Sequence, residues 1–151
     1  MRALRLFALI ALAACHDSTG PRPYGERIQL TARSVTATPG DTAHIRRVVL
    51  ESNTITVVGR ISTPDPCTQL AAYAKTQGST IAFTVVATES RGGCVTSLGL
   101  FEYTLTAAAP SCPHVTVTHH YVGSNWPDQQ VLDVGWICAY APAAAVRPPG
   151  A

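Results

Sequence analysis

The sequence predicts an all-β protein that folds as an antiparallel β-sandwich of about seven to eight strands with two disulfides. Three observations lead to this prediction. Short runs rich in Val, Ile, Thr and aromatic residues alternate with clusters of Gly, Pro, Ser and Asp. No run has the apolar spacing of an amphipathic helix. Four cysteines follow Cys15, an even number that suits two disulfides in an exported protein.

The candidate strands lie between residues 27 and 138. The strongest is Thr80–Thr88, which places Ile81, Phe83 and Val85 on one face. Residues 68–75 contain good helix formers, but their place between Cys67 and a Gly-Ser turn favours a strand. The number of runs and the turn spacing fit an immunoglobulin-like sandwich, without the Trp spacing of an antibody domain. The other expected strands cover residues 27–32, 45–50, 54–60, 100–106, 114–122 and 131–137.

The four later cysteines allow three pairings, of which we favour Cys67–Cys94 and Cys112–Cys138. Sequential pairs suit neighbouring strands. A hairpin centred on Asn125 would also place residue 112 opposite residue 138. A structural zinc site is the alternative, but the sequence has no C-x₂-C spacing and export favours oxidation.

The first fifteen residues have the three parts of a secretory signal. Met1–Arg5 carries two positive charges, and an apolar run of about nine residues follows, shorter than the roughly 20 residues of a membrane-spanning helix. Leu12-Ala13-Ala14-Cys15 resembles the lipobox of bacterial lipoproteins. That resemblance implies lipidation of Cys15 and cleavage before it. An ordinary signal peptide with an incidental cysteine is the alternative.

These features divide the chain into four parts. Residues 1–14 are the expected signal peptide, 15–26 the lipidated cysteine and a Pro-rich tether, 27–138 the sandwich, and 139–151 a disordered Ala/Pro tail. The formal charge of +2 comes from Arg2 and Arg5 of the signal, so the remaining chain has as many acidic as basic side chains. We therefore expect a membrane partner through the lipid and no nucleic-acid partner. His16 after the cysteine favours the outer membrane in a host with two membranes.

The middle of the chain resembles small bacterial lipoproteins of unknown activity that contain an immunoglobulin-like domain. The resemblance covers about residues 55–137 and rests on Val57–Ile61, Thr63–Cys67, Cys94 and Phe101–Tyr103. It implies an immunoglobulin-like fold and a location in the cell envelope, but no activity. Cys112 and Cys138 lie outside the pattern.

The sequence contains no pattern typical of an enzyme. It has no Gly-x-Ser-x-Gly elbow and no Gly-rich phosphate loop that leads into a helix. We expect a non-enzymatic, lipid-anchored module of the cell envelope, without a cofactor, that has a structural role or binds an envelope protein or a glycan.

A metal-binding protein is the alternative function. His114, His119 and His120 fall on one expected strand, and Asp133 falls on the next. Copper or zinc would suit these ligands. Adjacent residues of a strand point to opposite faces, so His119 and His120 cannot bind one ion together. The expected hairpin register places Asp133 diagonal to His119 on one face, which would supply half of a site.

The loop between these two strands is the candidate binding surface. It contains Asn125, Trp126 and Asp128, and an exposed Trp at a hairpin tip would suit a sugar ring or a protein partner. The alternative is that Trp126 packs beside Tyr121. For Trp136 we expect a place in the core or over the Cys112–Cys138 disulfide.

Lipidation gives the first testable prediction. The intact mass of the mature protein, extracted from membranes, should exceed that of residues 15–151 by the mass of its acyl chains. Cys15→Ala should abolish this increment. An unmodified N-terminus at His16 or later would contradict the prediction.

Overall fold

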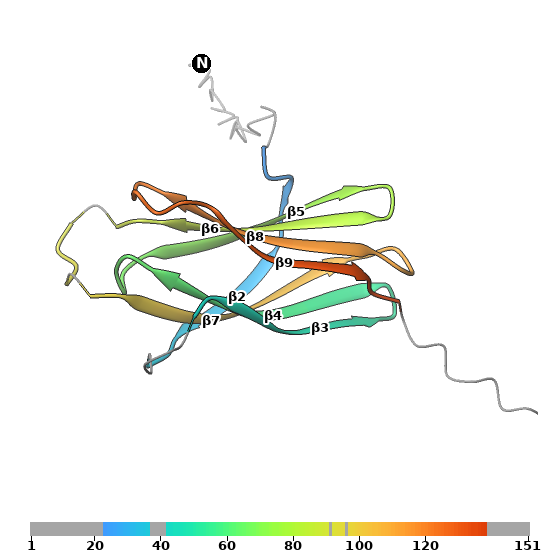
Figure 1. Ribbon diagram of the computed structural model, residues 1–151, viewed down its shortest axis with the longest axis horizontal. Helices are drawn as coiled ribbons and strands as arrows, with labels where there is room; N and C mark the ends of the chain where they lie inside the picture. The colour runs from blue at the N-terminus through green and yellow to red at the C-terminus, as the bar shows by residue number, and fades with distance from the viewer. Residues whose placement is uncertain (1–22, 37–41, 91, 96, 139–151) are drawn as a thin grey trace, which may run out of the picture.

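The computed structural model describes residues 23–36, 42–90, 92–95 and 97–138, which form two β-sheets packed face to face (Figure 1). Within these residues no helix is long and apolar enough to cross a membrane. The expected signal peptide, Cys15 and the Ala/Pro tail lie outside the described residues.

The two sheets contain nine described strands. The five-stranded sheet has the order β1 (Glu26–Arg27), β5 (Gln69–Gln77), β6 (Thr80–Thr88), β8 (His114–Val122) and β9 (Gln129–Trp136). The four-stranded sheet has the order β2 (Gln29–Ser34), β7 (Gly99–Ala108), β4 (Thr54–Thr63) and β3 (His44–Glu51). The predicted sandwich is confirmed, as are both predicted disulfides, Cys67–Cys94 and Cys112–Cys138.

One strand pair departs from the expected antiparallel arrangement. β6 and β8 run parallel, from Thr80 opposite His114 to Thr88 opposite Val122, while the other pairings are antiparallel. Between these two strands the chain crosses to the other sheet as β7 and then returns. It therefore enters β8 in the direction of β6, because parallel neighbours require such a crossover connection.

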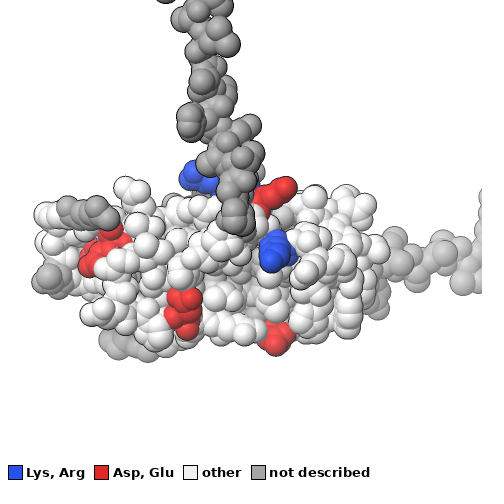
Figure 2. Space-filling model, turned by 90° about the horizontal axis from the view of Figure 1, so that it is seen from above, with Lys and Arg blue, Asp and Glu red and all other residues white. Residues whose placement is uncertain are grey.

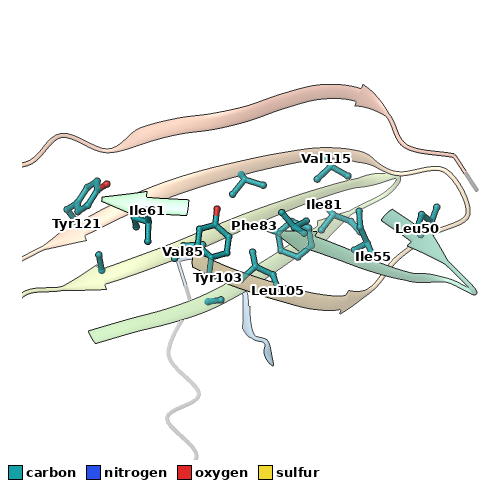
Figure 3. Close-up of a cluster of buried hydrophobic side chains, with 14 residues drawn as sticks. Leu50, Ile55, Ile61, Ile81, Phe83, Val85, Tyr103, Leu105, Val115 and Tyr121 are labelled. Atoms are coloured by element: carbon teal, nitrogen blue, oxygen red, sulfur yellow. The ribbon is translucent and has the colours of Figure 1, made fainter. Parts of the chain in front are cut away.

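The core lies between the sheets and follows the alternation of each strand (Figure 3). Ile81, Phe83 and Val85 of β6 are buried on one face, as the sequence predicts. Tyr103 and Leu105 of β7 face them from the other sheet, also fully buried. Each such side chain stabilises the fold by roughly 1.5–3 kcal/mol through removal of apolar surface from water.

The segment with helix formers is a strand, as predicted. In β5 the alternate residues Leu70, Ala72 and Ala74 pack against the core. β5 pairs with β1 on one edge and with β6 on the other, and one of its faces is buried against the core. These interactions outweigh the modest helix propensity of Ala, Gln and Lys.

The register of the β8–β9 hairpin differs from the prediction. His114 lies opposite Trp136 as expected, but two irregularities shift the rest, so His119 lies opposite Gln129 and Asp133 opposite Thr116. The predicted diagonal placement of Asp133 beside His119 on one face is therefore wrong. A β-bulge adds an unpaired residue to one strand and changes the register beyond it, which a count from the loop cannot anticipate. The disulfide prediction survives because the open end keeps its register.

Trp136 is not in the core. Its side chain is 61 % exposed and contacts His114 edge-on, with ring centroids 5.8 Å apart. Directly paired residues share a face, and His114 is on the outer face of β8, so its partner is turned outward too. The expectation that Trp136 lies in the core is therefore corrected.

Gly59 in the middle of β4 gives the second prediction. A Cβ at this position would lie 2.6 Å from the Tyr103 hydroxyl oxygen and 2.9 Å from Ile45 Cδ1. Gly59→Ala should therefore lower the free energy of unfolding by roughly 1–3 kcal/mol, measured by denaturant titration. Gly135→Ala is the control, because a Cβ there meets nothing within 4 Å. An equal effect of both substitutions would contradict the packing described for Tyr103.

Candidate functional site

A groove of about 470 Å³ lies between the β8–β9 loop and the chain that leads into β3. It contains the candidate binding loop of the sequence analysis, except for Asn125, which is exposed beside it. The lining residues combine aromatic, carboxylate, amide and hydroxyl groups: Thr42, Ala43, Ser62, Tyr121, Trp126, Pro127, Asp128 and Gln129.

Trp126 forms the apolar wall of this groove. Its indole is half-buried and packs edge-on against Tyr121, with ring centroids 5.4 Å apart. Its backbone N–H donates to Ser124 Oγ at 3.3 Å, which tightens the loop. The expectation of a fully exposed Trp at a hairpin tip is therefore wrong, and the packing alternative is confirmed. The indole still borders the groove.

Tyr121 joins the two sheets beneath the groove. Its hydroxyl donates to the backbone oxygen of Ser62 in β4 at 3.0 Å, and its ring is buried. Burial, with a smaller effect of the Asp128 charge, raises the pKa of Tyr121 to about 12. The phenol thus stays protonated and remains a donor throughout the physiological pH range.

A hydrogen-bonded chain runs from the groove to the N-terminal segment. Asp128 Oδ2 lies 2.7 Å from His120 Nδ1, and His120 Nε2 lies 2.7 Å from the hydroxyl of Tyr24. With Nδ1–H donating to the carboxylate, Nε2 of the neutral ring accepts from Tyr24. Asp128 Oδ1 also accepts from the Tyr121 N–H at 3.2 Å. The His120 hydrogen bond is the main cause that lowers the pKa of Asp128.

Tyr24 is held on the outer face of the five-stranded sheet by this chain. Its ring lies 4.9 Å from that of His120 and 5.8 Å from that of Tyr73, between centroids. The expected tether therefore ends in a fixed contact two residues before β1. The sequence placed Tyr24 in a flexible segment and did not indicate its partners. These come from β5 and β8, the two strands that flank β6, and only the strand order brings them together.

The alternative metal site does not form from the predicted residues. His119 points into the core, while His114 and His120 are on the opposite face of β8. Asp133 lies 3.4 Å from His114 Nε2, not beside His119. The bulged register and the alternation of strand faces account for this separation.

One other group of potential metal ligands is present among the described residues. Asp65, Cys67 and Cys94 offer ligand atoms within 4.8 Å of one another. The two sulfurs are joined in a disulfide, so they are not the thiolates that bind metals.

His119 is a core residue. It is fully buried, and its Nε2 lies 2.9 Å from the Tyr103 hydroxyl across the sandwich. The two rings meet edge-on at 5.6 Å. Burial lowers the pKa of His119 to about 4, so the imidazole is neutral at physiological pH.

The surroundings of Glu102, which lies in the expected strand at residues 100–106, are another feature that the sequence did not predict. The carboxylate binds Arg33 of β2 and Arg46 of β3. The clean alternation of β7 correctly turned Glu102 outward, but it gave no sign of which strands lie on either side.

Comparison with protein-family models, with curated proteins and with solved structures finds no significant match for this chain.

The burial of His119 gives the third prediction. In the folded protein the pKa of His119 is about 4, below the ordinary histidine value of 6.5. The unfolded chain therefore binds more protons in this window, and stability falls as the pH drops from about 6.5 to about 4, by about 3 kcal/mol in total. His119→Gln should remove this dependence, measured by denaturant titration at pH 7, 5.5 and 4.5.

His44→Gln on β3 is the control for this substitution and should keep the wild-type profile. If His119→Gln loses as much stability on acidification as the unmodified protein does, another group causes the pH dependence. Glu102 and Asp128 do not interfere in the upper part of the window, because both carboxyls have a lowered pKa.

Proposed function

We propose that this protein is a lipid-anchored module of the bacterial cell envelope that binds a glycan without catalysis. The observation that carries the proposal is the groove at Trp126, where an indole edge, a fixed carboxylate and an amide meet. Its volume of about 470 Å³ lies in the range of small-ligand sites, which is about 300–1,000 Å³.

The groove offers what a sugar ring needs. Asp128 accepts hydrogen bonds, and its orientation is fixed by His120 and by the Tyr121 N–H. Gln129 and Ser62 add amide and hydroxyl groups, while Trp126 offers an apolar surface for the C–H face of a pyranose. Because Asp128 and Trp126 are already held by their neighbours, little conformational entropy of these two side chains is lost when a ligand binds.

The proposed address rests on the Leu12–Cys15 lipobox, and the two disulfides support export. Both bonds, Cys67–Cys94 and Cys112–Cys138, suit an oxidising compartment. With Cys15 taken by lipid, the remaining cysteines are even in number. Two or three acyl chains hold a protein stably on a membrane, and we propose the outer membrane where the host has two.

We also propose kinship with the small lipoproteins that carry an immunoglobulin-like domain. The support is the motif Val57–Ile61, Thr63–Cys67 and Phe101–Tyr103, which lies in or next to β4 and β7. The sheets of an immunoglobulin-like fold are antiparallel, and the β6–β8 pair of this protein differs from them because its two strands run parallel.

The glycan proposal is tested with chitotetraose, a neutral tetramer of N-acetylglucosamine, by calorimetric titration of the full chain carrying Cys15→Ala. We expect saturable binding that weakens by about tenfold or more in Trp126→Ala and in Gln129→Ala, because each removes one wall of the groove. Gln129 is exposed, so its substitution tests the groove without disturbing the core.

Trp136→Ala is the matched control. This Trp is also on the β8–β9 hairpin, but it pairs with His114 at the far end from the groove. Its variant should bind as the unmodified chain does. Equal affinity of all three variants, or no binding of chitotetraose, would overturn a sugar site at Trp126.

A further inference from the structure

Basic side chains gather on the outer face of the four-stranded sheet. Arg33 of β2 lies opposite Glu102 of β7, which lies opposite Arg60 of β4, and Arg60 lies opposite His44 of β3. Paired residues of neighbouring strands share a face, so these side chains form one row across the sheet. Arg46 and Arg47 of β3 extend it. We name Arg33, Arg46, Arg47 and Arg60 the arginine row.

Glu102 is enclosed by this row. Its Oε1 accepts from Nη2 and Nε of Arg33 at 2.5 and 3.2 Å, and its Oε2 accepts from Nη1 of Arg46 at 2.7 Å. Arg60 Nε lies 3.7 Å from the same Oε2. Within the described residues, one carboxylate thus stands among three guanidinium groups, which gives this cluster a net positive charge.

The guanidinium groups reach further into solvent than the carboxylate does. The side chain of Arg33 is 73 % exposed and that of Arg46 is 49 % exposed, against 15 % for Glu102. A guanidinium has five N–H donors, and Glu102 engages only one or two from each of these arginines. The donors that Glu102 does not engage can bind a second anion from the solvent side.

The charge of the described residues is therefore segregated between the two sheets. Four of the six Lys and Arg side chains in the described residues belong to the arginine row. The side of the five-stranded sheet has scattered charges of both signs (Figure 2). Its acidic residues are Glu26, Glu89, Asp128 and Asp133. A mature chain with balanced charges can thus present a basic face, which the overall composition conceals.

The N-terminal contact decides which way this face points. Tyr24 lies against His120 and Tyr73 on the five-stranded sheet, and Figure 1 shows the described chain entering on that side. Tyr24 is nine positions after Cys15 in the sequence, a span of at most roughly 30–32 Å. This step rests on the proposed lipid anchor. The five-stranded sheet then faces the bilayer, and the arginine row faces away from it.

We propose that the arginine row binds an anionic glycan that carries carboxylate groups, such as a polymer of uronic acids. Glu102 shows how a carboxylate fits, since Arg33 holds it through both Nε and Nη2. The row crosses four strands, roughly 14 Å at the usual spacing, so it suits a chain of repeated anions. Its orientation away from the bilayer argues for a polymer and against lipid headgroups.

The test measures binding of polygalacturonate to the full chain carrying Cys15→Ala, at about 50 mM salt, where Debye screening is moderate. We expect Arg33→Gln/Arg46→Gln to weaken binding by about tenfold or more. The matched control is Arg27→Gln/Lys75→Gln on the other sheet, which removes the same net charge from two exposed positions. Its affinity should stay within about twofold of the unmodified chain.

Glu102→Gln separates a binding face from a structural ion cluster. Loss of the competing carboxylate should strengthen binding of polygalacturonate by about threefold or more, whereas a purely structural cluster would give weaker binding or none. Arg47→Gln is a milder variant at an exposed position, and it should weaken binding even where the double variant fails to fold.

An equal loss of affinity for polygalacturonate in the two double variants would overturn the proposal, because it would show that binding depends on net charge alone. Binding of anionic vesicles or duplex DNA through Arg33 and Arg46, without binding of polygalacturonate, would also overturn it. The absence of lipid on Cys15, or of chitotetraose binding in the groove at Trp126, would refute the proposed function. Neither result would change the expected binding of polygalacturonate by the arginine row.

Discussion

The contact between Tyr103 and His119 is the interaction on which the rest of the structure depends. Tyr103 of β7 packs over Gly59 of β4, and its hydroxyl meets the imidazole of His119 in the opposite sheet. Both side chains are fully buried. Their hydrogen bond pairs the Tyr103 hydroxyl with His119 Nε2, and an unpaired buried polar group costs about 1–3 kcal/mol. His119 Nδ1 has no hydrogen-bond partner among the described residues. The contact between Tyr103 and His119 fixes how the two sheets face each other.

The surface features follow from this pair through the alternation of strands. Glu102 precedes Tyr103, so it is turned to the outer face of the four-stranded sheet and lies among arginines. His120 follows His119, so it is turned to the outer face of the five-stranded sheet and binds Asp128 and Tyr24. One core contact thus places the basic face and the N-terminal contact on opposite sides of the molecule. The two faces are thus separated in space, as the proposed membrane anchor and the proposed polymer site require.

The sequence predicted the features that depend on local pattern. The alternation in Thr80–Thr88 and the strand at 68–75 follow from periodicity and turn residues, and the structure confirms the favoured one of three possible disulfide pairings. The prediction failed where a distant strand or an added residue decides the outcome. Bulges in the β8–β9 hairpin moved Asp133 away from His119, and the crossover through β7 made β8 parallel to β6. Trp126 packs on Tyr121 because the loop folds back, which its own residues do not reveal.

The sequence by itself determined the strand content and an even number of cysteines after Cys15, because each follows from neighbouring residues or from a simple count. Only the tertiary structure decided which residues of different strands meet. Tyr24 with His120, Arg33 with Glu102 and Tyr103 with His119 join positions 96, 69 and 16 residues apart. Such contacts depend on strand order and register, and these are set by the burial of all core faces together.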